Sequence, residues 1–162
     1  MQIVADIQVL ALIAAANTAP LVAKMIFGDH FSRAIDNGAT LWDGRPLFGP
    51  SKTIRGATLA IVAATVMAPL VGLEASLGFV IGVAAMAGDL CSSFCKRRLG
   101  FKASSKATGL DQIPESLLPA LVCWPILSIG AVDVLAIVAT FFVGEVLLSK
   151  VLFRLRLREH PY

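Results

Sequence analysis

The sequence predicts an all-α integral membrane protein with five transmembrane helices, and its composition and the placement of its charges both lead to this class. Of the 162 residues, 57% are hydrophobic and 15% are charged, and the mean hydropathy is +0.79. Soluble domains are typically about 45–50% apolar and about 25% charged. Because lipid cannot hydrogen-bond to a free backbone, helices are the expected spanning elements. The length favours a single domain over residues 1–162.

Five apolar stretches approach the roughly 20 residues that a helix needs to cross a bilayer. We expect the spans at residues 3–27, 54–73, 75–95, 114–130 and 132–153. Basic residues follow the first span rather than precede it, which favours a membrane anchor over a cleaved signal peptide. Very short turns without a basic residue, near Leu73-Glu74 and Gly130-Ala131, join the second span to the third and the fourth to the fifth.

The basic residues determine the predicted topology. All fourteen Lys and Arg residues fall into three clusters, separated by apolar runs long enough for a helical hairpin. The clusters are Lys24, Arg33, Arg45, Lys52 and Arg55; Lys96, Arg97, Arg98, Lys102 and Lys106; and Lys150, Arg154, Arg156 and Arg158. The positive-inside rule places all three in the cytoplasm. We therefore expect a multi-pass protein of the cell membrane, with its N-terminus outside, its C-terminus cytoplasmic and its chemical site on the cytoplasmic side.

The net charge of +3 and the isoelectric point near 9.0 have two interpretations. In a soluble protein they would suggest nucleic acid as a partner. In a membrane protein the simpler interpretation is topogenic charge that faces anionic lipid. We therefore expect the lipid bilayer, and no nucleic acid, as a partner. Cys91, Cys95 and Cys123 lack the spacing of a zinc site and are interpreted as small apolar helix residues.

The first cytoplasmic segment, residues 28–56, is too polar to span a membrane. Part of it resembles a Walker A loop, but two extra residues separate the last glycine from the lysine and no strand precedes it, which excludes a P-loop ATPase. Ser51, Lys52, Thr53 and Arg55 lie where the second span begins, and a helix N-terminus favours anions. An ordinary N-cap with flanking charges explains the same residues equally well.

The second cytoplasmic segment, between the third and fourth spans, is richer in candidate site residues. On a helix, Asp89, Ser92, Ser93 and Lys96 stand at i, i+3, i+4 and i+7 and share one face. An acid at the end of an apolar run is a functional candidate. The alternative is a topogenic cluster in which Asp89 forms an ion pair with Lys96. The combination of acids and hydroxyls favours the functional interpretation.

A second carboxylate, Asp111, follows in the same segment. Magnesium that is bound to a nucleotide takes one or two carboxylates and completes its shell with water and phosphate oxygens. Asp89 and Asp111 are therefore the candidate metal ligands, and Mg²⁺ is the expected cofactor. The cations around them suffice for a triphosphate: Lys96, Arg97, Arg98, Lys102 and Lys106.

These motifs resemble the CDP-archaeol synthase family, which is related to the phosphatidate cytidylyltransferases. The pattern is Asp89-x3-Ser93-Phe-x-Lys96-Arg97-Arg98-x-Gly100-x3-Ser104-Ser105, then Leu110-Asp111-Gln112-x-Pro114, with Asn17-x2-Pro20, Asp43-Gly44, Phe48-Gly49-x-Ser51-Lys52-Thr53-x-Arg55-Gly56 and Pro161-Tyr162. The resemblance extends from end to end of the chain. The second half of the wider phosphatidate cytidylyltransferase signature is missing. This favours the archaeol-type branch and leaves open whether one or two metal ions bind.

The resemblance implies transfer of CMP from CTP to an unsaturated archaetidic acid, with release of pyrophosphate. The implied partners are CTP and a membrane lipid phosphate. Asp89 and Asp111 would hold Mg²⁺ and, with Lys96 and Lys52, form the catalytic set. Arg55 or Arg98 would grip the lipid phosphate. The residues expected to bind CTP or its phosphates are Asn17, Ser51, Lys52, Thr53, Arg55, Ser92, Ser93, Lys96, Arg97, Lys102, Ser104 and Ser105.

The sequence also allows other roles for Asn17 and other functions for the protein. Asn17 is a site residue in the family-based interpretation, but an interhelical hydrogen bond explains it equally well. A transporter would spread polar residues through several spans, whereas here they concentrate at one face. A non-catalytic adaptor for anionic lipid explains the basic loops but not Asp89 and Asp111. The same transfer to diacyl phosphatidic acid needs only a different apolar groove. Glu145, inside the fifth span, receives no chemical role.

Overall fold

The computed structural model describes residues 2–102, 105 and 107–154, excluding the side chains of residues 150–154. This part of the chain contains five α-helices and no extended strand. The helices are α1 (Ile3–Phe27), α2 (Ile54–Leu70), α3 (Ala75–Arg98), α4 (Gln112–Leu127) and α5 (Ala131–Arg154). The all-helical fold predicted from the sequence is confirmed.

The helix bounds lie close to the expected spans, and the differences have local causes. Helix α2 ends three residues before the predicted limit, because Gly72 adopts a φ of +81° and turns the chain. Helix α3 continues to Arg98, three residues beyond the predicted limit. Its last turn therefore carries three consecutive cations, which interact favourably with the negative end of the helix dipole.

Three helices are long and apolar enough to cross a membrane: α1, α3 and the part of α5 up to Ser149. Helices α2 and α4 are also apolar but have only 17 and 16 residues. At about 1.5 Å per residue they extend about 25 Å, slightly less than the hydrocarbon core of a typical bilayer.

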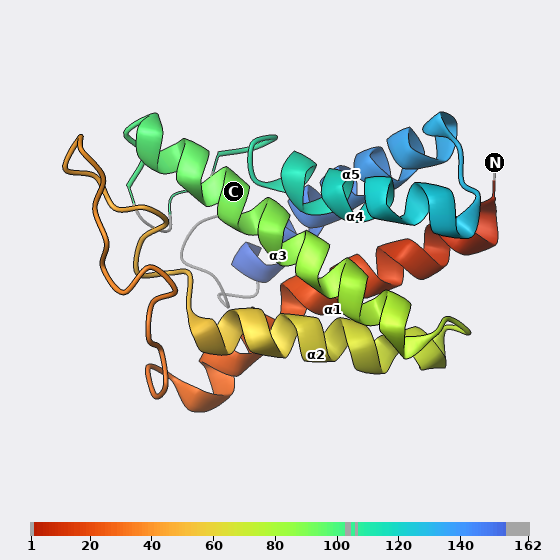
Figure 1. Cartoon of the computed structure of the whole chain (residues 1–162), viewed down its shortest axis with the longest axis horizontal. Helices are drawn as coiled ribbons and strands as arrows, with labels where there is room; N and C mark the ends of the chain where they lie inside the picture. The colour runs from red at the N-terminus through yellow and green to blue at the C-terminus, as the bar shows by residue number, and fades with distance from the viewer. Residues whose placement is uncertain (1, 103–104, 106, 155–162) are drawn as a thin grey trace.

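Helices α1 to α4 lie side by side along the long axis of the molecule (Figure 1). Helix α2 packs against both α1 and α3. The α2–α3 contact is close because small residues face each other. A Cβ atom at Gly78 would lie 2.5 Å from the backbone oxygen of Ala64, which is too close for any side chain. Ala60, Ala64 and Ala68 are fully buried in this contact region.

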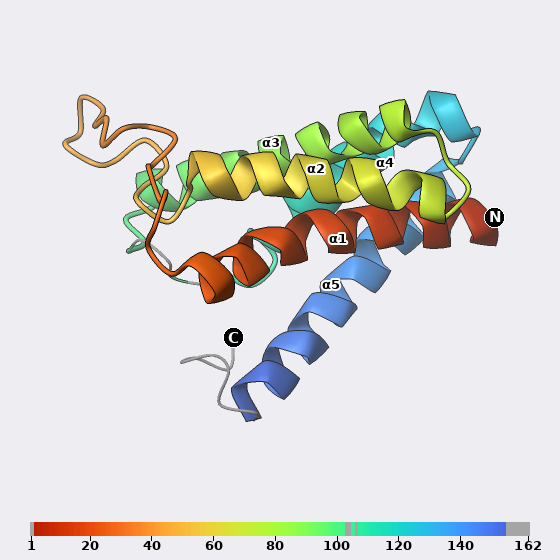
Figure 2. The same cartoon turned by 90° about the horizontal axis from the view of Figure 1, so that it is seen from below.

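Helix α5 leaves the bundle and diverges from it toward its C-terminal end (Figure 2). Its start is tied to the N-terminus, because the Gln2 backbone N–H donates to Asp133 Oδ1 at 2.8 Å and the Gly130 N–H donates to Asp133 Oδ2 at 2.8 Å. Ile137 and Phe141 of its first half belong to the main apolar core, together with Val9 of α1 and other residues.

The segments between helices lie at opposite ends of the molecule. The long connection between α1 and α2 is at one end, where α3 also ends, and the N-terminus is at the other (Figure 1). Lys52, just before α2, and Lys96 and Arg97, in the last turn of α3, all lie at this loop-bearing end. The fold therefore brings two segments that are distant in the sequence to one end of the bundle.

Candidate active site

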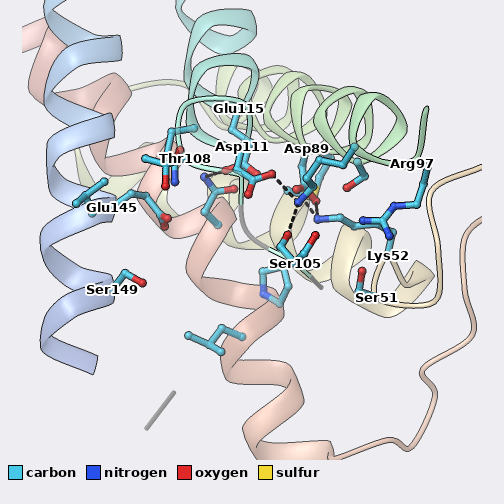
Figure 3. Close-up of a pocket in the computed structure, with 18 residues that line it drawn as sticks. Ser51, Lys52, Asp89, Arg97, Ser105, Thr108, Asp111, Glu115, Glu145 and Ser149 are labelled. Carbon is cyan, nitrogen blue, oxygen red and sulfur yellow. Dashed lines mark hydrogen bonds and ion pairs between the residues drawn. The ribbon is translucent and has the colours of Figure 1, made fainter. Parts of the chain in front are cut away.

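A cavity of about 380 Å³ opens at the loop-bearing end of the bundle (Figure 3). Its lining comes from four helices and from both polar segments. The lining residues are Asn17, Pro20, Leu21, Ser51, Lys52, Met86, Asp89, Ser93, Lys96, Arg97, Ser105, Thr108, Asp111, Gln112, Glu115, Glu145, Val146 and Ser149. Both predicted metal ligands and all four predicted catalytic residues thus line one cavity.

The first ion pair in the cavity joins the two polar segments. Lys52 Nζ lies 2.5 Å from Asp89 Oδ1 and 2.6 Å from Asp89 Oδ2. Thr53, the next residue, is the N-cap of α2, and its Oγ1 accepts a hydrogen bond from the Gly56 N–H at 3.1 Å. The N-cap interpretation is therefore confirmed for Thr53, and the cap directs the chain so that Lys52 points into the cavity.

The second ion pair replaces the one considered from the sequence. Lys96 does not bind Asp89. Its Nζ lies 2.6 Å from Asp111 Oδ1 and donates to the backbone oxygen of Ser105 at 3.0 Å. Seven residues along a helix span about 10 Å, so Asp89 and Lys96 face the same side but stand two turns apart. Lys96 is only 7% exposed, and the pair with Asp111 satisfies its buried charge.

Arg97 and Ser93 add further groups to this wall of the cavity. Arg97 is 5% exposed, and its Nε has no hydrogen-bond partner in the described part of the chain. The Ser93 hydroxyl is also buried without a partner among the described residues. Because buried polar groups are usually hydrogen-bonded, these two groups are available to a polar ligand that enters the cavity.

Glu115 is a cavity residue that the sequence analysis did not identify. Helix α4 approaches α3 closely beside Asp89, since a Cβ at Gly88 would lie 2.2 Å from the Pro114 backbone oxygen. The Glu115 carboxyl consequently interacts with that of Asp89. Asn17 Nδ2 donates to Glu115 Oε2 at 3.2 Å. The interhelical bond considered for Asn17 is therefore present, and the same side chain also lines the cavity.

Glu145 and Ser149 of α5, with Thr108 and Gln112, are further lining residues that the sequence analysis missed. For Glu145 a signal existed, because an ionisable residue inside an apolar span is a functional candidate by default. Figure 3 shows Glu145 on α5, on the side of the cavity away from Lys52 and Arg97. The cavity therefore has a basic side near Lys52 and one further acid, Glu145, on the side of α5.

The two arginines expected at a lipid phosphate do not belong to the described lining of the cavity. Arg55 donates to the backbone oxygens of His30 and Gly28 and stacks on the Phe27 ring. These contacts fasten the first polar segment to the end of α1.

Arg98 has a similar role at the end of α3. It binds Asp43 Oδ1 at 2.5 Å, donates to the backbone oxygens of Arg45 and Pro46 and stacks on Phe94. Arg45 reciprocates with a hydrogen bond to the Arg98 backbone oxygen at 2.5 Å. The main hydrogen-bonding groups of Arg98 are thus engaged in holding the first segment against α3.

The remaining predicted phosphate ligands are distributed unevenly. Ser51 and Ser105 line the cavity. Thr53 lines a smaller cavity of about 70 Å³ beside it, together with Lys52 and Asp89. Ser92 is fully buried, lies outside the described lining and donates to the Asp89 backbone oxygen at 2.9 Å. Lys102 is exposed and away from that lining. Ser104 is outside the described residues.

Comparison with known proteins places this site in a family. The sequence profile of the CarS-like CDP-archaeol synthases matches residues 71–162, more than half of the chain. A CDP-archaeol synthase of Sulfurisphaera tokodaii is 33% identical over 135 residues, which cover 79% of this chain and 81% of that protein. The chain belongs to the CDP-archaeol synthase family. The resemblance inferred from the sequence motifs is confirmed.

Two further comparisons agree with this membership. A CDP-archaeol synthase of Methanopyrus kandleri is 41% identical over 98 residues, which cover 57% of this chain and 56% of that protein. A solved structure of an intramembrane enzyme for archaeal membrane lipid biosynthesis superimposes with a TM-score of 0.76 and 29% identity. It covers 88% of this chain and 90% of its own. This member of the CDP-archaeol synthase family is thus a membrane-embedded helical protein.

The donor set of the cavity is compatible with magnesium. The described residues contain no group of three or more His, Cys, Asp and Glu side chains placed to hold a metal ion. Asp89 and Asp111 nevertheless present hard oxygen donors to one cavity, and the unpartnered Ser93 hydroxyl lies in the same lining. Magnesium bound by one or two carboxylates together with substrate phosphates requires no larger protein cage. The residues present therefore fit this ion in a complex with a nucleotide.

Proposed function

We propose that this protein transfers CMP from CTP to an unsaturated archaetidic acid and releases pyrophosphate. The family membership supports a cytidylyltransferase, because the curated relatives are CDP-archaeol synthases. The observation that carries the proposal is the cavity itself. It gathers the cations Lys52, Lys96 and Arg97 around Asp89 and Asp111 at one end of a membrane-embedded bundle.

The proposed reaction joins an oxygen of the lipid phosphate to the α-phosphorus of CTP. The bond from that phosphorus to the pyrophosphate oxygen breaks, and pyrophosphate leaves with the bonding electrons. A phosphate monoester is already anionic near pH 7, so the nucleophile needs no general base. The obstacle is electrostatic, because an anion attacks another anion. Catalysis therefore consists mainly of positioning and charge neutralisation.

Lys52 and Lys96 would neutralise the triphosphate and the departing pyrophosphate, and Arg97 would bind the lipid phosphate that attacks. The two lysines form ion pairs with Asp89 and Asp111, which place both cations at the cavity wall. On nucleotide binding the lysines would exchange these carboxylates for phosphate oxygens at the same wall, where fixed cations stabilise the charge that develops in the reaction. Arg97 offers a planar fork that matches phosphate oxygens, and part of this group has no partner among the described residues.

Asp89 and Asp111 would hold Mg²⁺ when CTP is bound. Bound there, the ion would supply charge stabilisation for the phosphate oxygens of the nucleotide. Ser93 would offer its unpartnered hydroxyl to the same complex.

The lipid phosphate is assigned differently from the expectation based on sequence. Arg55 and Arg98 were the expected ligands, but both bind backbone oxygens outside the described lining of the cavity. Arg97 lines the cavity and is the better candidate. The lipid chains would remain in the bilayer while the phosphate enters the cavity.

We infer that all five helices span the cell membrane, with the N-terminus outside and the cavity facing the cytoplasm. The three basic clusters support this orientation through the positive-inside rule. Helices α2 and α4 are short for the span, but α2 packs between two longer helices, and a local thinning of the bilayer accommodates such a mismatch at modest cost.

The direct test incubates the purified protein in detergent with radiolabelled CTP and Mg²⁺. Geranylgeranylated archaetidic acid and diacyl phosphatidic acid are supplied in separate reactions. We expect label to enter the lipid phase only with the first. Transfer only to diacyl phosphatidic acid would retain the chemistry and change the substrate. Absence of transfer to either lipid, together with absence of CTP binding, would contradict the proposed function and favour a non-catalytic adaptor.

A further inference from the structure

The first polar segment is organised around one buried carboxylate, that of Asp36. Asp36 is 9% exposed and accepts three backbone hydrogen bonds. Oδ1 accepts from the Gly38 N–H at 3.1 Å, whereas Oδ2 accepts from the Phe48 N–H at 2.9 Å and from the Gly49 N–H at 2.8 Å. The carboxylate thus ties the start of the segment to a stretch twelve residues later.

The stretch that Asp36 holds leads directly to Lys52. The Lys52 N–H donates to the Gly49 backbone oxygen at 3.2 Å, so a turn of the chain separates the Asp36 contact from the catalytic lysine. On the other side, the Ile35 N–H donates to the Lys52 backbone oxygen at 2.8 Å. Ala34 and Thr53 form an isolated antiparallel bridge next to it. The backbone of Lys52 is therefore bonded at both its N–H and its oxygen, and Asp36 secures the turn that contains one of these bonds.

The ionised form of Asp36 is the one that the site stabilises. Burial opposes ionisation, but the hydrogen bonds from Gly49, Phe48 and Gly38 outweigh it, so the pKa of Asp36 lies below its usual value. Its charge is balanced by backbone N–H groups, since the ion pairs of the described chain do not include it. An amide at this position has only one accepting oxygen, whereas both Asp36 oxygens are used.

We propose that Asp36 is a positioning residue for cytidylyl transfer: it holds the Phe48–Gly49 backbone so that the Lys52 ammonium reaches the cavity and the Asp89 carboxylate. This inference rests on the proposed function of the same site. Asp36 does not line the cavity in the described part of the chain, so it acts through Lys52 and does not touch the nucleotide.

The test is a double-mutant cycle on CTP binding, measured by equilibrium dialysis of the detergent-solubilised full chain. Asp36→Asn replaces one accepting oxygen by a donor that opposes a backbone N–H. We expect it to weaken CTP binding about tenfold when Lys52 is present. A buried backbone N–H loses its partner, and the Lys52 ammonium is no longer held in the cavity. In a Lys52→Ala background the same change should have at most about a twofold effect, because coupled residues are not additive.

A structural role without coupling to Lys52 predicts a different result. In that case Asp36→Asn would weaken binding by the same factor in both backgrounds, and this outcome would overturn the proposal. Unchanged binding in the single variant would overturn it as well. Asp29→Asn is the matched control, because Asp29 is an exposed carboxylate of the same segment. It should bind CTP as the parent does.

A second variant keeps the proposal testable where Asp36→Asn does not fold. Asp36→Glu retains the charge but moves both oxygens by one methylene group, and it should also weaken CTP binding in a manner that depends on Lys52. If the Asp36→Glu variant bound CTP as tightly as the parent, this result would contradict the positioning role. Because the experiment measures CTP binding and not turnover, its results can be interpreted even if the protein does not catalyse the proposed transfer. Conversely, an active parent with an unaffected Asp36 variant would refute only the positioning role.

Discussion

Lys52 and Asp89 are 37 positions apart in the sequence, and Lys52 Nζ contacts both carboxylate oxygens of Asp89, at 2.5 and 2.6 Å. The contact connects the residues just before α2 to the second half of α3 at the wall of the cavity. It holds a cation and an acid of the candidate site against each other. Both side chains are partly exposed, at 22% and 18%, so they remain accessible to a nucleotide.

Loss of the Lys52 ammonium should affect catalysis more than folding. For Lys52→Ala we expect kcat/KM for CTP to fall by at least about 10²-fold, the range seen when one preorganised charge-stabilising group is removed. The measurement is initial-rate kinetics of label transfer to lipid. Lys24→Ala is the control, because Lys24 is an exposed cation at the end of α1. Equal activity of the Lys52 variant and the parent would contradict the role of Lys52.

Substitution of Asp89 or Asp111, unlike substitution of the lysines, should change how turnover depends on the Mg²⁺ concentration. We expect Asp89→Asn and Asp111→Asn to raise the Mg²⁺ concentration needed for half-maximal turnover and to lower the maximal rate, because an amide is a weaker ligand for this ion. The check is a titration of activity with Mg²⁺ at saturating CTP. A normal magnesium response of Asp89→Asn would exclude that residue as a ligand.

The close contact between α3 and α4 should not tolerate a methyl group at position 88. The Cβ of Gly88→Ala would lie 2.2 Å from the Pro114 backbone oxygen, so α4 must move away and carry Glu115 from Asp89. We expect a loss of about 1–3 kcal/mol in the free energy of unfolding and a loss of activity. Thermal unfolding in detergent measures the first effect.

Gly144→Ala is the matched control for this substitution. Gly144 also lies in a helix, but a Cβ there meets no atom within 4 Å among the described residues. This variant should unfold at the temperature of the parent or slightly above it, because alanine favours helix over glycine. A Gly88 variant that behaves like the Gly144 variant would show that the α3–α4 contact relaxes freely.

Three arginines near the site should separate into two groups. Arg97→Ala should raise the KM for the lipid phosphate, because Arg97 lines the cavity. Arg98→Ala should mainly lower stability, by about 1–3 kcal/mol, since Arg98 binds Asp43 and two backbone oxygens. Arg55→Ala should behave like Arg98→Ala. Initial-rate kinetics at varied lipid phosphate concentration measure the KM of each variant. A KM raised only in the Arg55 or the Arg98 variant would favour that arginine, and not Arg97, as the ligand of the lipid phosphate.

The depressed pKa of Asp36 predicts a loss of stability in acid. Because the folded-state pKa lies below the unfolded value, the stabilisation is fully present above the unfolded pKa, about 4 for aspartate, and is lost as the pH falls through the folded value. The Tm difference between the parent and Asp36→Asn should therefore be constant at neutral pH and should shrink below about pH 4. A difference that persists unchanged into strong acid would show that the Asp36 charge is not responsible.

Much of the architecture follows from local sequence. The five apolar runs predicted five helices near their observed positions, because hydropathy and helix length are properties of one segment in contact with lipid or with neighbouring helices. Thr53 as an N-cap was predictable for the same reason, since its hydroxyl bonds to an N–H three residues later. The motifs around Asp89, Lys96 and Asp111 correctly identified the family.

The pairing of the charges was not predictable from spacing. Helical periodicity places Asp89 and Lys96 on one face, but it does not reveal that Lys52 and Asp111 come nearer to them. Glu115 lines the cavity because Gly88 allows α4 to approach α3 closely. The spacing of residues along the chain does not predict this contact between two helices. Arg55 and Arg98, the lipid-phosphate candidates of the sequence, also bind backbone oxygens of the first polar segment, and spacing does not predict those contacts.

Composition, apolar runs and short motifs were enough to predict the membrane class, the family and most residues of the charged cavity. The packing of distant segments was needed to show which acid pairs with which base, which arginine lines the cavity, and that Asp36 organises the segment before Lys52. The two kinds of interaction act over different distances along the chain. Hydropathy, helix capping and motif chemistry act over a few residues, whereas an ion pair or a buried carboxylate depends on short distances between segments that chain folding brings together.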